Sequence, residues 1–540
     1  MFKLPKYARW PWEYPLASEK EKPIVSVETL ATDAARFAEL FPGTEIVVPL
    51  TSPAALRDAF RDKLNNTASL QHISSKTAYL LGMAYLRGVG VERDFNRAIR
   101  LLELAAKDCG EFGLHAAQQL AYIYENGIGT NVDYSKVLEW MKKDVAYSEQ
   151  LLGLEHPDTA AAYNDIAFVY GKQGNYTREM EWYQKALAIK EKVLGNEHLD
   201  TATTYNNIAG EYRRQGDYTL ALEWYQKVLA IHEKVLDKEH PLIAITYNNI
   251  ANVYENHGEY ALALEWFQKA LAINEKVLGK EHLDTVIIYN NIAGVYCRQG
   301  NYTLALELYQ KALAIFEKVL GKEHPDTAIT YNNIAVVYDQ QGKYARAWEW
   351  YQKALAIREK VLGKEHPSTA TAYNNIAMLY SNKRDYARAL EWLQKALAIE
   401  EKVLGKEHPS TALTYSNFAV VYSNKRDHAR ALKWLQKALA IWEKVLGKEH
   451  PDTAIAYYNI AMVYNKQGDY VHAQEWLQKA LAINEKVFGK EHPNTVIIRR
   501  YISVIRILIW FQGCGGYIII LLLASGLLYL LYRLVYWIIQ

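Results

Sequence analysis

The sequence lacks features that several classes of protein require. Its 540 residues include only three cysteines, Cys109, Cys297 and Cys514, and none belongs to a CxxC pair or a metal-type spacing. This scarcity argues against a disulfide framework and fits a reducing compartment. The 62 basic residues nearly balance the 60 acidic ones, so the chain lacks the basic surface that binding to phosphate backbones requires. We therefore expect no nucleic acid among its partners.

Catalytic, metal-binding and export signatures are also missing. No HExxH, GxSxG or Walker sequence occurs, so we expect no enzymatic activity, no cofactor and no small-molecule substrate. Nine histidines recur in Glu-His pairs from His156 to His492, one per repeat along an edge. Zinc ligands must converge at about 2 Å from one ion, so this row predicts linker turns and no metal site. No apolar run follows Met1, and we expect no cleaved secretory signal.

The sequence has instead a repeat of 42 residues. Variants of Tyr-Asn-Asn-Ile-Ala recur at this interval from Tyr163 to Tyr457. A period between about 20 and 50 residues indicates a solenoid, because one repeat cannot bury its apolar face alone. In the repeat of residues 199–240, apolar residues at spacings of three and four predict one helix before Gly216 and a second amphipathic helix after it. The pattern predicts an all-α solenoid of helical hairpins.

The repeat resembles the tetratricopeptide repeat (TPR). The resemblance rests on the Ile-Ala pair, a Gln-Gly-x-Tyr turn and a later Tyr-Gln-Lys-Ala-Leu, and it covers residues 157–495. Because a typical tetratricopeptide repeat has about 34 residues, the extension Glu-Lys-Val-Leu-Gly-Lys-Glu-His-Pro makes this repeat similar to those of kinesin light chains. The resemblance implies a right-handed α-solenoid with a concave groove. Nothing ahead of residue 150 reads as the heptad coiled coil of a kinesin light chain, so we infer no motor subunit.

A shorter repeat precedes the long one. Gly88 and Asp94 are echoed 39 residues later by Gly127 and Asp133, and this Gly-x-Gly-x-x-x-Asp loop resembles Sel1-like repeats. We divide the chain accordingly into four segments. They are a capping segment (1–70), two Sel1-like repeats (71–150), eight 42-residue repeats (151–495), and a basic juxtamembrane segment with a membrane helix (496–540).

The membrane helix is predicted from the last residues of the chain. No charged residue occurs from Tyr517 to Tyr532, and a helix from Tyr517 to the C-terminus would span about 36 Å, enough to cross a hydrocarbon core of about 30 Å. Arg499, Arg500 and Arg506 lie on the repeat side of this span, which favours a cytoplasmic solenoid. We predict a single-pass, tail-anchored membrane protein. The alternative is a buried helix that closes the last repeat.

The candidate binding residues follow from the resemblance. In related repeats the second asparagine of the pair bonds the backbone of an extended peptide, because an amide can both donate and accept. The candidates are Asn207, Asn249, Asn291, Asn333, Asn375, Asn417 and Asn459, with Asp165 in the first repeat. The alternative is that these amides satisfy a neighbouring helix end. Basic residues near the N-terminal end of the groove would attract acidic peptide segments; they are Lys172, Arg213, Arg214 and Arg298.

One further position varies widely among the repeats, directly after Ala-Ile in the second helix. Its residues are Lys190, His232, Asn274, Phe316, Arg358, Glu400, Trp442 and Asn484. This range predicts a partly exposed position, with Phe316 and Trp442 as aromatic anchors for a partner. The leading hypothesis is a membrane-anchored adaptor that binds extended peptide segments in its groove. The alternative is a structural spacer or self-association platform with no groove ligand.

Overall fold

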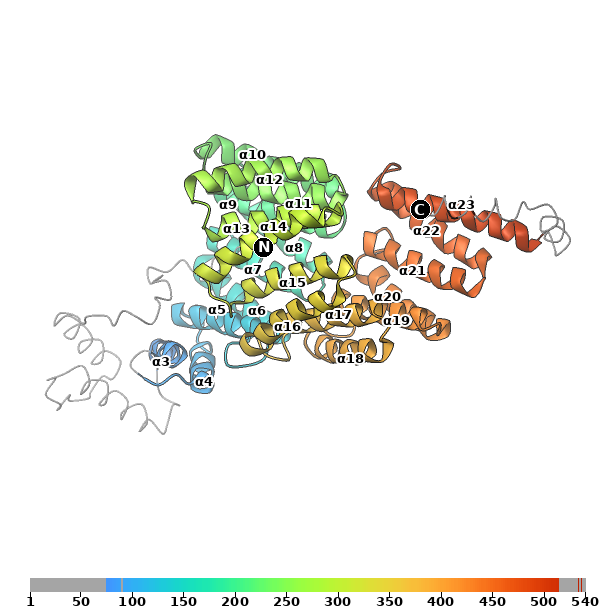
Figure 1. The fold of residues 1–540 in the computed structure, drawn as a ribbon. Helices are drawn as coiled ribbons and strands as arrows, with labels where there is room; N and C mark the ends of the chain where they lie inside the picture. The colour runs from blue at the N-terminus through green and yellow to red at the C-terminus, as the bar shows by residue number, and fades with distance from the viewer. Residues whose placement is uncertain (1–73, 89–90, 514–532, 534–535, 537–540) are drawn as a thin grey trace, which may run out of the picture. The chain divides into compact units, whose positions relative to one another are not determined.

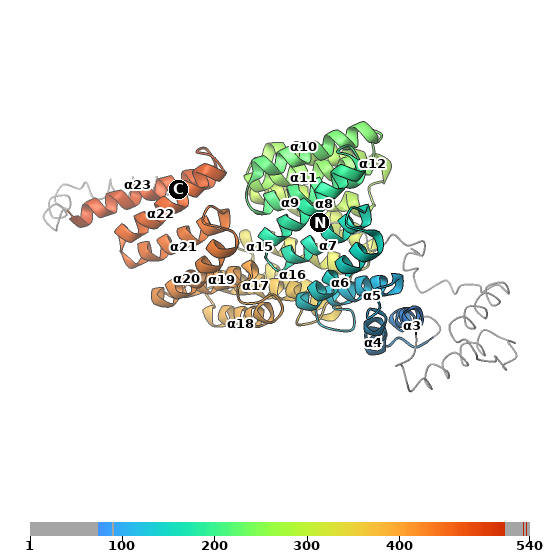
Figure 2. The same cartoon turned by 180° about the vertical axis from the view of Figure 1, so that it is seen from behind.

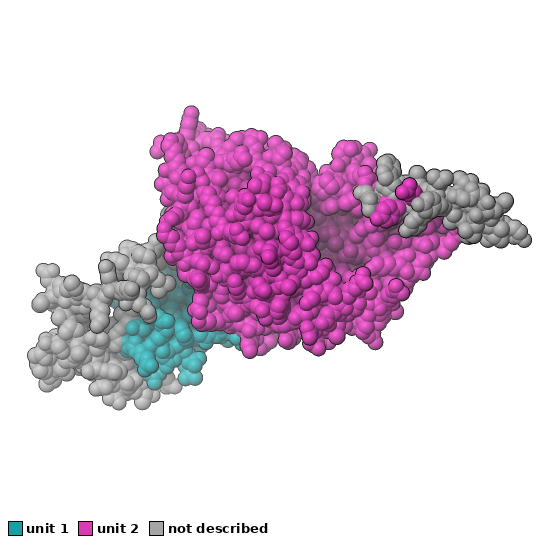
Figure 3. Space-filling view, in the orientation of Figure 1, with its two compact units in different colours: residues 1–169 teal, residues 170–540 magenta. Residues whose placement is uncertain are grey.

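The computed structural model describes residues 74–88, 91–513, 533 and 536. The chain divides into two compact units, residues 1–169 and 170–540, coloured separately in Figure 3. The described residues form helices joined by turns, with no strand among them (Figure 1). This confirms the predicted all-α repeat solenoid.

Unit 1 contains the two shorter hairpins. Its helices are α3 (Ser75–Arg87), α4 (Phe95–Ala105), α5 (Glu111–Asn126), α6 (Tyr134–Leu152) and the first part of α7 (Pro157–Lys172). Helix α3 packs on α4 and helix α5 on α6. The echoed glycine and aspartate have one role in both hairpins, because Gly88 and Gly127 end helices in the left-handed conformation while Asp94 and Asp133 cap the following helices.

Unit 2 repeats one hairpin from α8 (Tyr176–Leu194) onward, and Figures 1 and 2 show the hairpins in sequence from opposite sides. The first helices of successive repeats are α9 (Leu199–Arg214), α11 (Pro241–His257), α13 (Leu283–Arg298), α15 (Pro325–Gln340), α17 (Pro367–Asn382), α19 (Pro409–Asn424) and α21 (Pro451–Gln467). The second helices are α10 (Tyr218–Val235), α12 (Tyr260–Val277), α14 (Tyr302–Val319), α16 (Tyr344–Val361), α18 (Tyr386–Val403), α20 (His428–Val445) and α22 (Tyr470–Val487). Helix α23 (Pro493–Gly513) follows them.

The linker histidines begin the first helices. In each linker the Nδ1 atom accepts a hydrogen bond from the backbone N–H two residues later, as His324 does from Asp326 at 3.2 Å. The same bond occurs at all nine positions, namely His156, His198, His240, His282, His324, His366, His408, His450 and His492. A helix start leaves several N–H groups unpaired, so these imidazoles act as N-caps. Asp217 and its equivalents cap most second helices similarly.

The repeated alanines lie in the core between the helices. Ala209 and Ala221 are fully buried, which lets the aromatic rings of neighbouring helices interdigitate. The repeat tyrosine donates its hydroxyl proton to a glutamate 14 residues earlier, as Tyr205 does to Glu191 at 2.6 Å. First helices of consecutive repeats also lie directly against one another, for example α11 with α13 and α17 with α19. The first helices therefore line the concave side of the stack.

The array continues beyond the predicted end of the repeats. Helix α23 packs on α22 and buries Ile498, Ile502 and Ile505, so the predicted boundary at residue 495 falls inside a ninth first helix. Arg499 occupies the tyrosine position, and its guanidinium bonds Glu485, again 14 residues earlier, at 2.8 Å. The helices of the described part include none long and apolar enough to cross a membrane. The predicted span from Tyr517 lies outside the described residues, apart from residues 533 and 536.

Candidate functional site

The asparagine pairs form a ladder along the first helices. In five of the seven cases the second asparagine of one repeat donates its amide N–H to the first residue of the pair in the preceding repeat, and within the described part of the chain no such bond is found for Asn207 or Asn333. Asn249 bonds Asn206, Asn291 bonds Asn248, and Asn375 bonds Asn332, each at 2.8 Å. The ladder continues from Asn417 to Asn374 at 3.2 Å and from Asn459 to the Ser416 hydroxyl at 3.4 Å. These amides are thus tied to the neighbouring repeat, at the side chain of its asparagine or serine.

The ladder leaves part of each amide available. A carboxamide has two N–H donors and an oxygen with two lone pairs, and each rung uses one N–H of the second asparagine. All seven predicted second asparagines are half-buried on the first helices. The first helices therefore present a row of half-buried amides, five of which are oriented by rungs. Their contact with a peptide remains a prediction.

The predicted basic cluster is paired with buried carboxylates. The Arg214 guanidinium bonds both Glu179 and Glu211, the latter at 2.5 Å, and neither carboxylate is exposed. Burial raises the pKa of Glu179, because the low-dielectric interior disfavours its charged form, and the charge of the Arg214 guanidinium opposes this shift. The Nε atom of Arg298 lies 3.3 Å from Oε1 of the nearly buried Glu255. At these positions the groove presents ion pairs, so its positive charge is smaller than the sequence suggested.

The side chains at the ends of the first helices change along the array. In the C-terminal half, Asn382 donates to Asp339 at 3.2 Å, Asn424 to Ser381 at 3.4 Å and Lys466 to Ser423 at 3.1 Å. Each contact joins residues 43 positions apart, so it links neighbouring repeats. The concave side thus passes from arginine–glutamate pairs in its early repeats to mostly amide and hydroxyl contacts in its later ones.

The prediction of exposed aromatic anchors is wrong. Phe316 is 2% exposed and Trp442 is 3% exposed, and the whole variable position is buried. The residues there face the next first helix, where they meet individual partners: His232 bonds Thr246 at 3.0 Å, and Glu400 accepts from Thr414 at 2.6 Å. A comparison of each variable residue with the residue 14 positions later would have revealed this pairing. Trp442, for example, is followed at that distance by Ala456 in the same hydrophobic cluster.

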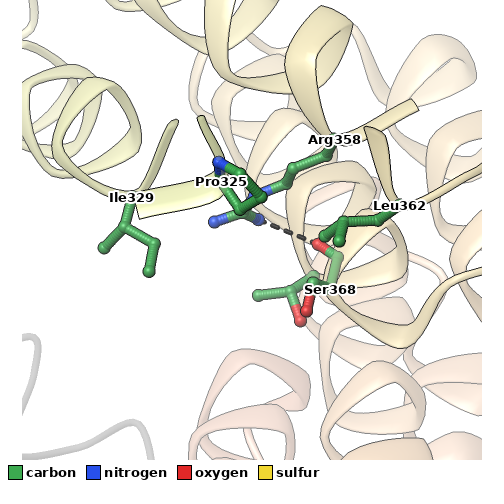
Figure 4. Close-up of a pocket in the computed structure, with 6 residues that line it drawn as sticks. Pro325, Ile329, Arg358, Leu362 and Ser368 are labelled. Carbon is green, nitrogen blue, oxygen red and sulfur yellow. Dashed lines mark hydrogen bonds between the residues drawn. The ribbon is translucent and has the colours of Figure 1, made fainter. Parts of the chain in front are cut away.

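A small pocket lies at the linker edge beside another residue of the variable position. Pro325, Ile329, Arg358, Leu362, Ser368 and Thr371 line a volume of about 190 Å³. The Arg358 guanidinium donates to the Ser368 carbonyl at 2.8 Å (Figure 4). Typical small-molecule sites enclose about 300–1,000 Å³, so this pocket is smaller than such a site. Among the described residues, no group of histidine, cysteine, aspartate and glutamate is placed to hold a metal ion.

Family comparisons agree with this arrangement. The tetratricopeptide repeat profile matches nine overlapping stretches between residues 138 and 507. The Sel1 repeat profile matches residues 75–108 and 114–143. A search of curated protein sequences finds no match.

Several solved structures are similar. The nearly identical TPR-like repeats of a candidate kinesin light chain from Podosopora anserina share 29% identity over 38% of this chain and 97% of theirs, with a TM-score of 0.32. BtubC (BKLC) from P. vanneervenii shares 26% identity over 44% of this chain and 92% of its own, with a TM-score of 0.34. A Rap protein complexed with competence and sporulation factor shares 16% identity over 69% and 97%, with a TM-score of 0.48.

Proposed function

Because the chain belongs to the tetratricopeptide repeat family, we propose that its concave side binds extended segments of other proteins. The observation that carries the proposal is the asparagine ladder on the first helices. It holds amides in one row at the spacing of the repeats, and an extended peptide backbone offers donors and acceptors that such amides can satisfy. Many similar contacts in series would give weak, reversible binding that strengthens with the number of repeats engaged.

The expected ligand follows from the charges on the concave side. Arg214 and Arg298 are already paired with glutamates, so a strongly acidic segment gains little from them. The amide-rich later repeats favour segments that bind mainly through their backbone, with small or polar side chains. Acidic segments, which the sequence predicted, are the competing class in the test.

The ladder offers matched variants for this test. In the rung between Asn291 and Asn248, and in that between Asn375 and Asn332, only the second asparagine is a predicted peptide contact. Asn291→Ala with Asn375→Ala removes both the rungs and the predicted contacts. Asn248→Ala with Asn332→Ala removes the same rungs and keeps the contacting amides.

The assay is selection of phage-displayed random 16-residue peptides on the full-length protein, followed by affinity measurement on the selected peptides. We expect the Asn291/Asn375 variant to lose at least tenfold in affinity while the Asn248/Asn332 variant stays within about threefold of wild type. Equal losses in both variants would mean that the ladder is structural only. Selection of no peptide by the wild-type protein would favour the spacer hypothesis.

The adaptor is proposed to be anchored in a membrane by residues 517–540, with the repeats on the cytoplasmic side. Support comes from the uncharged run that begins at Tyr517 and from Arg500 and Arg506 on its repeat side. The test is flotation of the full-length chain with phosphatidylcholine vesicles, against a chain that ends at Gly513, the last residue of α23. Flotation of both chains, or of neither, contradicts the anchor.

A further inference from the structure

Within unit 2, hairpin turns early in the array touch linkers far along the chain. The Nε2 atom of His408 lies 3.1 Å from the carbonyl oxygen of Lys172, the last residue of α7. The Nε2 atom of His450 lies 2.8 Å from the carbonyl oxygen of Arg214, the last residue of α9. Both contacts join residues 236 positions apart. The same contact is therefore made by two consecutive repeats, each with the linker six repeats later.

A third contact continues the series. The ring of Phe488, just before the linker of His492, stacks on His257 at 6.4 Å between ring centroids and lies 5.9 Å from the ring of Tyr218. A Cβ atom at Gly258 would lie 2.2 Å from Nε2 of His492. We call this line of three contacts the seam. It joins the turns that follow α7, α9 and α11 to the linkers that precede α19, α21 and α23.

The seam gives its histidines a second role. Nδ1 of His408 and of His450 accepts the N–H that begins α19 and α21, so Nε2 carries the proton of the neutral ring and donates it to the carbonyl. The carbonyls at the end of a helix lack partners within it. Each histidine thus joins the start of one helix to the end of another. The His450 side chain is 5% exposed, whereas that of His198, in a linker outside the seam, is 44% exposed.

The seam is thin in comparison with the stack. Consecutive hairpins share continuous hydrophobic clusters, such as the one that runs from Ala293 to Val421. The seam consists of two histidine bonds, the ring contacts of Phe488 and the approach of linker residues to turn glycines. A contact of this size can open while the hairpins stay folded, since the stability of a repeat array resides mainly in its neighbouring interfaces.

We propose that the seam is a releasable clasp that closes unit 2 around its concave side and controls which protein segments enter it. The proposal rests on the proposed function, because it concerns access to the same surface. First helices line the concave side. Because the seam joins early hairpins of the array to hairpins six repeats later, a protein segment cannot enter the concave side laterally while the seam is closed. Figure 3 shows the surface of unit 2 hollowed beside its C-terminal helices. A segment with a free end can thread in, whereas a segment between two folded domains needs the seam open.

The turn glycines provide variants that open the seam and leave the hairpin intact. A Cβ atom added to Gly174 would lie 2.7 Å from Cδ of Pro409, and one added to Gly216 would lie 2.5 Å from Cδ of Pro451. At the equivalent Gly300 and Gly342, nothing lies within 4 Å. The four glycines have similar φ angles of 74°, 76°, 77° and 72°. The chain itself has arginine at the same turn position in two other repeats, Arg384 at φ 62° and Arg426 at φ 67°.

The experiment compares three full-length proteins: wild type, the seam variant with Gly174→Arg and Gly216→Arg, and the control with Gly300→Arg and Gly342→Arg. The first readout is carbethoxylation of individual histidines by diethyl pyrocarbonate, followed by mass spectrometry. We expect His408 and His450 to react at least tenfold more slowly than His198 in wild type and control. In the seam variant their rates should approach that of His198. If His408 and His450 react as fast as His198 in all three proteins, the seam is not closed in solution.

The second readout is the association rate of one peptide selected on the wild-type protein, presented in two forms. One form is the free 16-residue peptide, and the other is the same sequence between two folded domains. We expect wild type and control to bind the flanked form at least tenfold more slowly, and the seam variant to bind both forms at similar rates. If wild type binds both forms equally fast, the clasp does not control access. If no protein binds the free peptide, the proposed function itself fails, and control of access fails with it.

Discussion

Glu400 carries a carboxyl group inside the interface between α18 and α19, and its charge should weaken that interface. The side chain is 3% exposed and accepts hydrogen bonds from Thr414 at 2.6 Å and Asn374 at 3.2 Å. Burial raises its pKa from an ordinary value of 4.5 to about 7, against the opposing effect of these two bonds. Above pH 7 the folded chain must therefore hold a charge that the unfolded chain leaves in water.

The sign and size of the effect follow from this difference. Below about pH 4.5 the carboxyl is protonated in both states, and it costs nothing. As the pH rises toward 7, the unfolded chain releases the proton while the folded chain retains it, so the free energy of unfolding falls. Each unit of pKa difference is worth about 1.4 kcal/mol, so the full penalty above pH 7 is about 3 kcal/mol. A neutral isostere should remove it.

The perturbation is Glu400→Gln, whose amide can accept from Asn374 and donate to Thr414. At pH 8.5 we expect the variant to unfold at a higher urea concentration than wild type, because the free energy of unfolding of that interface rises by up to about 3 kcal/mol. Near pH 4.5 the variant should match wild type. Because a repeat array need not unfold in one step, hydrogen exchange of the amides in α18 and α19 localises the effect. Glu391→Gln, an exposed carboxylate on the same helix, is the control for net charge.

A variant that is less stable than wild type at pH 8.5 would refute the reasoning. So would a difference that does not change between pH 4.5 and pH 8.5, because burial of the charge would then not determine the stability. An equal gain in Glu391→Gln would instead assign the effect to net charge.

Two further predictions concern stability. Phe316→Ala should lower the free energy of unfolding by about 3–5 kcal/mol, because the ring is 2% exposed beside Tyr289 and Ala312; an exposed anchor would give a change within about 0.5 kcal/mol in the same urea titration. Lys318→Ala should cost less than about 1 kcal/mol, because the ion pair between Lys318 and Glu281, although 2.7 Å long, is 65% and 61% exposed; a larger loss at 0.5 M salt would contradict this.

Local features of the fold could be predicted from the sequence because each repeat carries its own signals. The 42-residue period, the glycine in the turn and the His-Pro start of the first helix gave the hairpins. A glycine and an aspartate that each recur after 39 residues indicated the shorter repeats, in which Gly88 ends one helix and Asp94 caps the next. Such signals act within a few residues, so they can be read without knowledge of the distant chain.

Features that depend on partners in other repeats could not be predicted in this way. Polar residues such as Arg358 and Glu400 suggest exposure when each position is considered alone, and only the opposing helix explains their burial. Arg499 looked like the end of the repeats, although its bond to Glu485 replaces the tyrosine–glutamate bond. The contacts of His408 and His450 join residues 236 positions apart, and the nine linker histidines look alike in sequence.

The buried variable position makes most of the interfaces between repeats chemically distinct. Hairpins this similar could stack in many orders, within one chain or between two chains. The pairs His232 with Thr246 and Glu400 with Thr414 differ from one interface to the next, and Trp442 meets alanine where all but one of the other repeats have threonine or isoleucine. In most misordered stacks a tryptophan would lie against a residue bulkier than alanine, or a carboxylate would be buried without a hydroxyl partner. The order of the repeats is thus specified in part by these pairs, and duplication or exchange of a single repeat would change the residues paired at two interfaces.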